Sequence, residues 1–325
     1  MTPAVLAGVD GSPESTVAAH WAAGEALRRG APLRLLHAWP WLTDGRASFA
    51  DPEDLPVAAQ RMLAAVAEEI GARHPGLTMR TDVVLDAAVD GLVAATAVTE
   101  VAAATEATDA TDATEAVDLL VLGSRGLGGF KGLLVGSVSM AVAGRAAVPV
   151  VVVRRPESGA KTGAESGTGS AGGTGTGSAG EAGVVPEVVV GVDAGAPSDT
   201  VLDFAFREAE LRGARLRAVH GWNLPATFAV VGFLPSGTET AQLQAAEEKA
   251  LAAALAGHRA RHPQVEVVEQ VGLGAARTLV EGTADAALLV VGRRRRPHDL
   301  APRLGRTAHA VLHHARPPVA VVPHD

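Results

Sequence analysis

The sequence predicts an α/β protein built from two tandem domains, each a five-stranded parallel sheet with helices on both faces. Three observations lead to this prediction. The chain repeats itself, short β-branched strands alternate with amphipathic helical stretches in each repeat, and a segment rich in Gly, Ser, Thr and Ala separates the repeats. Such alternation, with strands that are apolar on both faces, is typical of a doubly wound sheet.

The repeat is visible at both ends of each domain. Pro3–Trp39 aligns without a gap on Pro186–Trp222, and 16 of these 37 positions are identical. Leu120–Val153 aligns in the same way on Leu289–Val322. The two offsets, 183 and 169, differ by 14 residues, so the first domain carries an extra segment of about that length. A low-complexity Ala/Thr tract near residues 102–116 accounts for it, and we expect a longer helix or a solvated loop there.

The elements of the first domain can be placed in order. The first helix should begin at Ser12-Pro13, because a serine hydroxyl caps free amides and proline suits the first turn. The expected strands lie near Val5–Asp10, Leu33–Trp39, Thr78–Leu85, Leu119–Gly123 and Val150–Arg154. The expected helices lie near Pro13–Arg29, Pro56–His74, Ala87–Ala97 and Ser137–Ala146.

Domain boundaries follow from composition. Residues 156–185 hold too few apolar side chains to offset their ordering entropy, so we expect a flexible linker between domains at 1–155 and 186–325. The fifth strand of each domain, Pro149–Arg154 or Pro318–Pro323, should lie at an apolar sheet edge that needs covering.

Composition excludes several classes of protein. The chain of 325 residues has a formal charge of −8, so nucleic acid is not an expected partner. It has no cysteine, which excludes disulfides and thiolate sites. No signal peptide is visible, and the apolar runs are far shorter than the roughly 20 residues that span a bilayer. We therefore expect a cytoplasmic protein with no membrane partner.

Two features should meet where the strands of the first domain end, which is where open parallel sheets bind ligands. One is Asp10, followed by the turn Gly11-Ser12, with the backbone near His37-Ala38 beside it. The other is Gly123-Ser-Arg125-Gly126, then nine residues, then Gly136-Ser137-Val138-Ser139 at a helix start. Free amides at that helix start would bind an anion, and glycines would let a ligand approach the backbone.

These segments resemble the universal stress protein family. VDLLVLGSRGLGGFKGLLVGSVS and VDGSPES…EALRRGA…LHAW are similar to its ATP-binding signature and its opening block, and the resemblance covers both halves. It implies tandem Rossmann-like (adenine nucleotide alpha hydrolase-like) domains that bind ATP or a related nucleotide, with or without Mg²⁺. It also implies dimer formation and a role in stress or dormancy. It also implies that the residues at the nucleotide are Asp10, Gly123, Gly126, Gly136, Ser137 and Ser139.

The second domain departs from this pattern. Asp193, Gly292 and Gly305 are retained, but Arg295 replaces the middle glycine and Arg306 the serine. An altered or lost site is the leading interpretation. The alternatives are that Arg293–Arg296 and Arg306 bind phosphate through their guanidinium groups, or that they form a solvated loop.

The sequence leaves three functional hypotheses. It has no Walker lysine motif, G-x-S-x-G elbow or H-E-x-x-H motif. A nucleotide-binding regulator with little or no turnover is therefore favoured over a slow ATPase or nucleotidyl-transfer enzyme, and over a scaffold that binds no nucleotide. Universal stress proteins commonly pair through the fifth strand, so the resemblance implies an internal pseudo-dimer or a homodimer. His37 and His220 are interpreted as local hydrogen-bonding groups.

Overall fold

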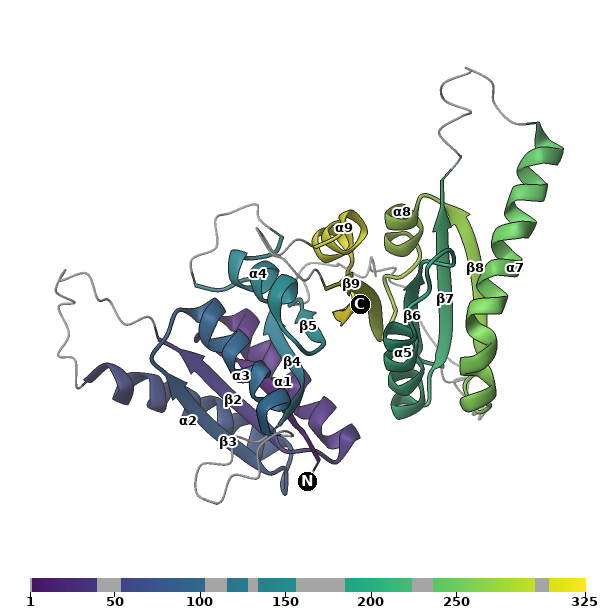
Figure 1. Cartoon of the computed structure of the whole chain (residues 1–325). Coiled ribbons are helices and arrows are strands. Elements are labelled where there is room, and N and C mark those ends of the chain that lie inside the picture. The colour runs from purple at the N-terminus through teal and green to yellow at the C-terminus, as the bar shows by residue number, and fades with distance from the viewer. Residues whose placement is uncertain are drawn as a thin grey trace, which may run out of the picture.

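The chain forms one ten-stranded sheet with helices on both faces (Figure 1). This computed structural model describes residues 2–39, 54–102, 116–127, 134–155, 185–223, 236–295 and 304–325. The Ala/Thr tract and the linker predicted from the sequence lie almost wholly outside these ranges. No helix within them is long and apolar enough to cross a membrane.

The elements of the first domain agree with the prediction to within a few residues. They are β1 (Ala4–Gly8), α1 (Pro13–Arg29), β2 (Leu33–Ala38), α2 (Asp54–Arg73), β3 (Met79–Val84), α3 (Ala88–Ala102), β4 (Val117–Gly123), α4 (Ser137–Arg145) and β5 (Val150–Val153). The second domain repeats them as β6 (Glu187–Val192), α5 (Asp199–Arg212), β7 (Arg215–Trp222), α7 (Gly237–Arg261), β8 (Val267–Leu273), α8 (Ala275–Val280), β9 (Leu288–Arg294), α9 (Arg306–His314) and β10 (Val319–His324).

The strand order is β3-β2-β1-β4-β5-β10-β9-β6-β7-β8, which is the same series of equivalent strands read from either end. All neighbours pair in parallel except β5 and β10, which run antiparallel with Val152 opposite Val319 and Val150 opposite Val321. The fifth strand is thus the edge of its own domain, and the other domain covers it. This pairing gives the two domains a pseudo-twofold relation.

Two apolar layers hold the helices to the sheet. One contains α1, α2, α5 and α7, and the other contains α3, α4, α8 and α9, each continuous across both domains. The four valines of β5 are at most 3% exposed, so they are buried on both faces as the sequence pattern indicates. Burying a valine contributes roughly 1.5–3 kcal/mol, so the β5–β10 seam is part of the core.

A buried group of four charges, the charge quartet, joins α1 to α5. It consists of Glu25 and Arg29 with their equivalents in the repeat, Glu208 and Arg212, and all four side chains are at most 8% exposed. Arg212 Nη2 lies 2.6 Å from Glu25 Oε2, and Arg29 bonds Glu208 reciprocally. Burial raises the pKa of Glu208, against the opposing effect of its arginine partners. The same contact is therefore made twice across the pseudo-twofold relation.

Candidate functional site

A cavity of about 650 Å³ opens at the carboxyl ends of β1 and β4 in the first domain. Nine of the residues predicted from the sequence line it: Asp10, Ala38, Gly123, Arg125, Gly126, Gly136, Ser137, Val138 and Ser139. Gly11 and Ser12 are not among the lining residues. Gly11 forms the turn with φ +83°, while the Ser12 hydroxyl accepts from the Ser15 amide and caps α1.

Asp10 ties the end of β1 to the loop that follows β4. Its Oδ1 accepts hydrogen bonds from the Ser12 amide at 3.0 Å and the Ser12 hydroxyl at 2.6 Å. Its Oδ2 accepts from the Leu127 amide at 3.2 Å. Burial alone would raise the pKa of Asp10, but the hydrogen bonds from Ser12, Ser15 and Leu127 outweigh burial and lower it. Asp10 is therefore ionised at neutral pH.

The glycines of the first domain have different physical roles. A Cβ at Gly123 would lie 2.8 Å from the Glu14 carbonyl carbon, so this glycine lets β4 pack against the start of α1. A Cβ at Gly126 would overlap the Asp10 carboxylate. A Cβ at Gly136 would meet nothing closer than 3.6 Å, so this position has room for a Cβ.

The start of α4 faces the cavity. Gly136 is the N-cap in extended conformation, and no side chain caps the helix. The amides of Ser137, Val138 and Ser139 have no acceptor among the residues that the structure describes. The Ser139 hydroxyl is different, because it donates to the Gly123 carbonyl at 2.7 Å and is buried. Ser139 therefore offers an amide to the cavity, while its hydroxyl fixes α4 to β4.

Apolar side chains that were not predicted from the sequence form a further part of the wall. Leu36 and Leu122 come from β2 and β4, Leu127 comes from the loop after β4, and Ala88 and Leu92 come from α3. The sequence pattern indicates these α3 residues only weakly, because the way the helix lies over the sheet decides which of its positions reach the cavity. His37 also lines the wall, and its Nδ1 donates to the Val9 carbonyl at 2.6 Å, which confirms the local role predicted for it.

The second domain has a smaller cavity of about 470 Å³ at the equivalent place. Asp193, Gly292, Gly305 and Arg306 line it as expected. His220, also in the wall, donates from Nδ1 to the Val192 carbonyl at 2.9 Å and contacts Glu247, so its local role is confirmed as well.

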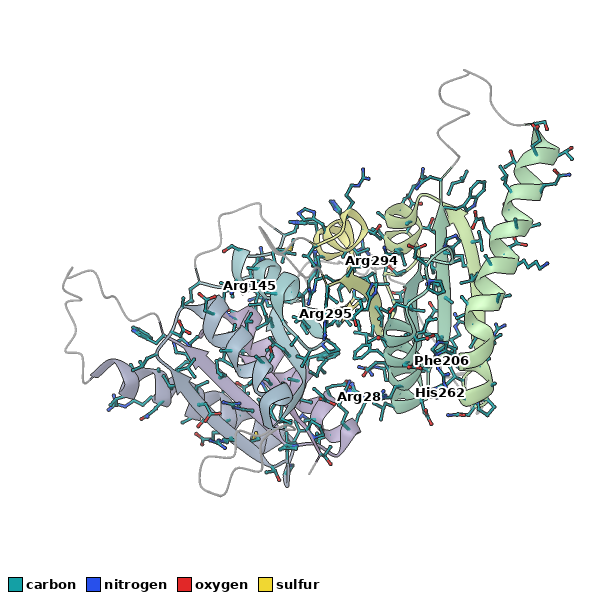
Figure 2. The ribbon with its side chains drawn as sticks, in the orientation of Figure 1. Arg28, Arg145, Phe206, His262, Arg294 and Arg295 are labelled. Atoms are coloured by element: carbon teal, nitrogen blue, oxygen red, sulfur yellow. The ribbon has the colours of Figure 1, made fainter. Side chains whose placement is uncertain are left out.

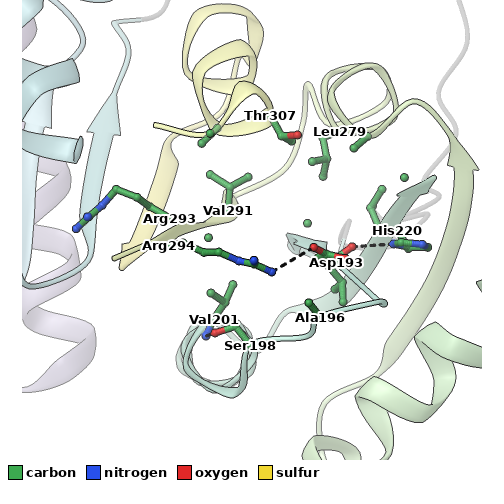
Figure 3. Close-up of a pocket in the computed structure, with 18 of the residues that line it drawn as sticks. Asp193, Ala196, Ser198, Val201, His220, Leu279, Val291, Arg293, Arg294 and Thr307 are labelled. Carbon is green, nitrogen blue, oxygen red and sulfur yellow. Dashed lines mark hydrogen bonds and ion pairs between the residues drawn. The ribbon is translucent and has the colours of Figure 1, made fainter. Parts of the chain in front are cut away.

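Arg295 was expected in this cavity, and the structure does not place it there. Its guanidinium donates to the Ala147 carbonyl of the first domain at 2.8 Å, and it lies between the two domains in Figure 2. Arg293 also points away, donating to the Ala146 carbonyl at 2.5 Å, whereas Arg294 points toward Asp193 with 3.7 Å between Nη2 and Oδ2 (Figure 3). The strand continues to Arg294, so side chains alternate in direction along it. Arg296 lies outside the described residues.

No group of three or more metal-binding side chains occurs in the part of the chain that the structure describes. The rings of His309 and His313 are 4.6 Å apart on α9. The pKa of His313 is lowered by burial and by its histidine neighbours.

Comparison with known proteins places these observations in a family. The model of the universal stress protein family matches residues 1–154 and 186–323. A universal stress protein of Mycobacterium tuberculosis (strain H37Rv) is 30% identical over 332 residues, covering 98% of this chain and 96% of the relative. One from Mycolicibacterium smegmatis is 32% identical over 329 residues, with the same coverage.

Solved structures show the same fold. The crystal structure of a universal stress protein from Archaeoglobus fulgidus superposes with a TM-score of 0.59 at 20% identity, and the match covers 100% of both chains. A protein of Pseudomonas aeruginosa whose function is unknown superposes with a TM-score of 0.55 at 17% identity, over 100% of this chain and 93% of that one. The family match covers both domains and the relatives match nearly end to end, so this chain is a tandem member of the universal stress protein family.

Proposed function

We propose that the first-domain cavity binds an adenine nucleotide, with ATP as the expected ligand, and that the chain is a stress-response regulator with little or no turnover. The observation that carries this proposal is the uncapped start of α4. Three free amides there face a cavity whose opposite wall is apolar. Such a cavity can hold a phosphate group at one end and a base at the other.

The binding free energy of a nucleotide requires contacts at both the phosphate end and the base end of the cavity. A helix terminus contributes roughly 0.3–1 kcal/mol for a nearby anion, whereas micromolar affinity needs about 8 kcal/mol. Hydrogen bonds to a charged group add about 1.5–3 kcal/mol each. The amides of Ser137, Val138 and Ser139 would therefore supply most of the phosphate binding, with the Gly126 backbone nearby.

The nucleoside would lie against Leu36, Ala38 and the α3 residues Ala88 and Leu92. Asp10 is ionised, and its Oδ2, which accepts only the hydrogen bond from Leu127 among the described residues, can accept a further bond. It would therefore bind a ribose hydroxyl or help to hold Mg²⁺ beside the phosphates. The fit of these groups to a nucleotide supports the proposal.

Low turnover follows from the composition of the wall. Asp10 is the one carboxylate lining the cavity among the described residues, and it already accepts three hydrogen bonds. Hydrolysis needs a residue that orients the attacking water and charge that stabilises the transition state. We propose that occupancy of the site, rather than a reaction, is what the protein reports, and that the second domain is degenerate as a nucleotide site.

The decisive variant is Gly136→Asp. Aspartate is a favoured N-cap and Gly136 already has extended backbone, so the new carboxylate can accept from the free amides and place a negative charge where a phosphate would lie. We expect thermal stability to be unchanged or higher, while ATP affinity measured by isothermal titration falls about tenfold or more.

The control is Gly136→Ala, which adds a Cβ in available space but no charge and no cap. We expect its ATP affinity to stay within about threefold of the wild type, because the amides remain free. Equal affinity in the wild type and Gly136→Asp would refute the proposal. Native mass spectrometry of freshly purified protein should also detect bound nucleotide in the wild type and less of it in Gly136→Asp.

A further inference from the structure

The cavity of the second domain has a different chemical character from that of the first. Among the described residues, the charged side chains of its wall, apart from histidines, are Asp193, Arg293, Arg294 and Arg306, but Arg293 points away from the cavity toward the Ala146 carbonyl. Among the described residues of the first domain, the charged side chains of the cavity wall, apart from histidine, are Asp10 and Arg125, and Arg125 is paired with Glu14 at 3.1 Å. The second cavity is thus smaller and carries an excess of positive charge, which favours an anion.

Two of its arginines are placed to contact a ligand. Arg294 is the repeat equivalent of Arg125 and points into the cavity from the end of β9, with its side chain 60% exposed (Figure 3). Arg306 is the first residue of α9, lines the cavity, and has no ion pair among the described residues. Guanidinium groups bind phosphate oxygens through paired hydrogen bonds. The cavity therefore offers two such groups, one from β9 and one from α9.

The region equivalent to the proposed nucleoside wall is narrower. Gly221 replaces Ala38, and a Cβ there would overlap the backbone of Ala275 at the start of α8. The Gly274 amide also donates to the Trp222 carbonyl at 2.9 Å, which holds α8 against the end of β7. Less room remains for a planar base beside His220, consistent with about 470 Å³ against about 650 Å³.

We infer that the second-domain cavity binds the diphosphate or triphosphate group of a compact anion through Arg294 and Arg306, without recognising an adenine base. This inference does not depend on nucleotide binding by the first domain. The retained Asp193 opposes it, because its carboxylate pairs with Arg294 and repels phosphate. The site is therefore one in which an anion competes with Asp193 for the guanidinium group of Arg294.

The test uses the full chain carrying Gly136→Asp, so that the first cavity does not contribute. Inorganic pyrophosphate, tripolyphosphate, ATP and adenosine are titrated separately by calorimetry at one fixed salt concentration. We expect pyrophosphate or tripolyphosphate to bind, ATP to bind no more than about threefold tighter than tripolyphosphate, and adenosine not to bind. Adding Arg294→Gln or Arg306→Gln should weaken tripolyphosphate binding about tenfold or more, as expected for the loss of a charged hydrogen bond.

Arg277→Gln is the matched control, because it removes the same charge from α8 at a side chain that is 77% exposed and paired with Glu281 outside the cavity wall. We expect it to leave affinity unchanged. Asp193→Asn should tighten binding by releasing Arg294. The inference is wrong if no phosphate probe binds, if Arg277→Gln weakens binding as much as Arg294→Gln, if adenosine binds, or if Asp193→Asn weakens binding. Failure of the first-domain proposal would appear separately, as an unchanged ATP affinity in Gly136→Asp alone.

Discussion

Removing one arginine from the charge quartet should destabilise the whole chain. Arg212 is 5% exposed and contacts both Glu25 and Glu208, which are at most 1% exposed. In Arg212→Met, Arg29 would remain between two buried carboxylates, with partly exposed Asp118 at 3.2 Å as a further partner. Leaving a buried charge without its partner costs about 3–5 kcal/mol, so we expect a loss of that order in the free energy of unfolding.

Urea denaturation measures this loss, and the fluorescence of the four tryptophans includes Trp21, whose ring lies 5.8 Å from the Arg212 guanidinium. Coincident fluorescence and circular dichroism transitions would show that the domains unfold together. The exposed pair Arg277–Glu281 supplies a control, since Arg277→Met should cost only about 0.2–0.5 kcal/mol. Adding Glu208→Met to Arg212→Met should recover part of the loss, because Arg29 and Glu25 would then form a balanced pair.

The loss should also depend on pH. Burial raises the pKa of Glu208, so the folded state holds its proton to a higher pH than the unfolded state does. The resulting stabilisation of the folded state is complete below the ordinary pKa of 4.5 and is lost as pH rises through the folded pKa. Arg212→Met should therefore be less destabilising near the acid end of that window than at neutral pH. The account of the charge quartet would be refuted if Arg212→Met cost no more unfolding free energy than Arg277→Met. It would also be refuted if the losses of Arg212→Met and Glu208→Met simply added in the double variant.

Two other variants, with Gly305→Ala as a control, test the contribution of cavity residues to stability. Gly123→Ala should lower stability by about 1–3 kcal/mol, because its Cβ would press on the Glu14 backbone; Gly305→Ala, with nothing within 4 Å, should be neutral in thermal denaturation. Asp10→Asn should lose the stabilisation that ionised Asp10 provides above its ordinary pKa of 3.8. The difference in unfolding free energy between this variant and the wild type should disappear as pH falls through the lowered folded pKa. Denaturation at a series of acid pH values measures this difference, and an increase toward acid pH would contradict the prediction.

Much of the fold and the first-domain site could be predicted because they depend on local patterns. The repeat, the apolar strands and the Ser12 cap are all properties of short segments. The α3 wall could not be predicted, since it depends on how that helix lies across the sheet. The role of Arg295 was misjudged for a related reason: β9 pairs with β10 as far as Arg294 opposite His324, whereas β4 ends at Gly123. Two more residues of strand turned Arg295 toward the first domain.

The seam between β5 and β10 also limits how copies of this chain can associate. The backbone groups of β5 and β10 bond each other along this edge, so neither strand has a free edge for a second molecule. Two chains could pair through these strands only by exchanging whole domains. Residues 156–185 join the two domains covalently, so each of these strands always has its partner in the same chain. The duplication thus places both partner strands in one molecule, so every single chain completes this pairing at any dilution.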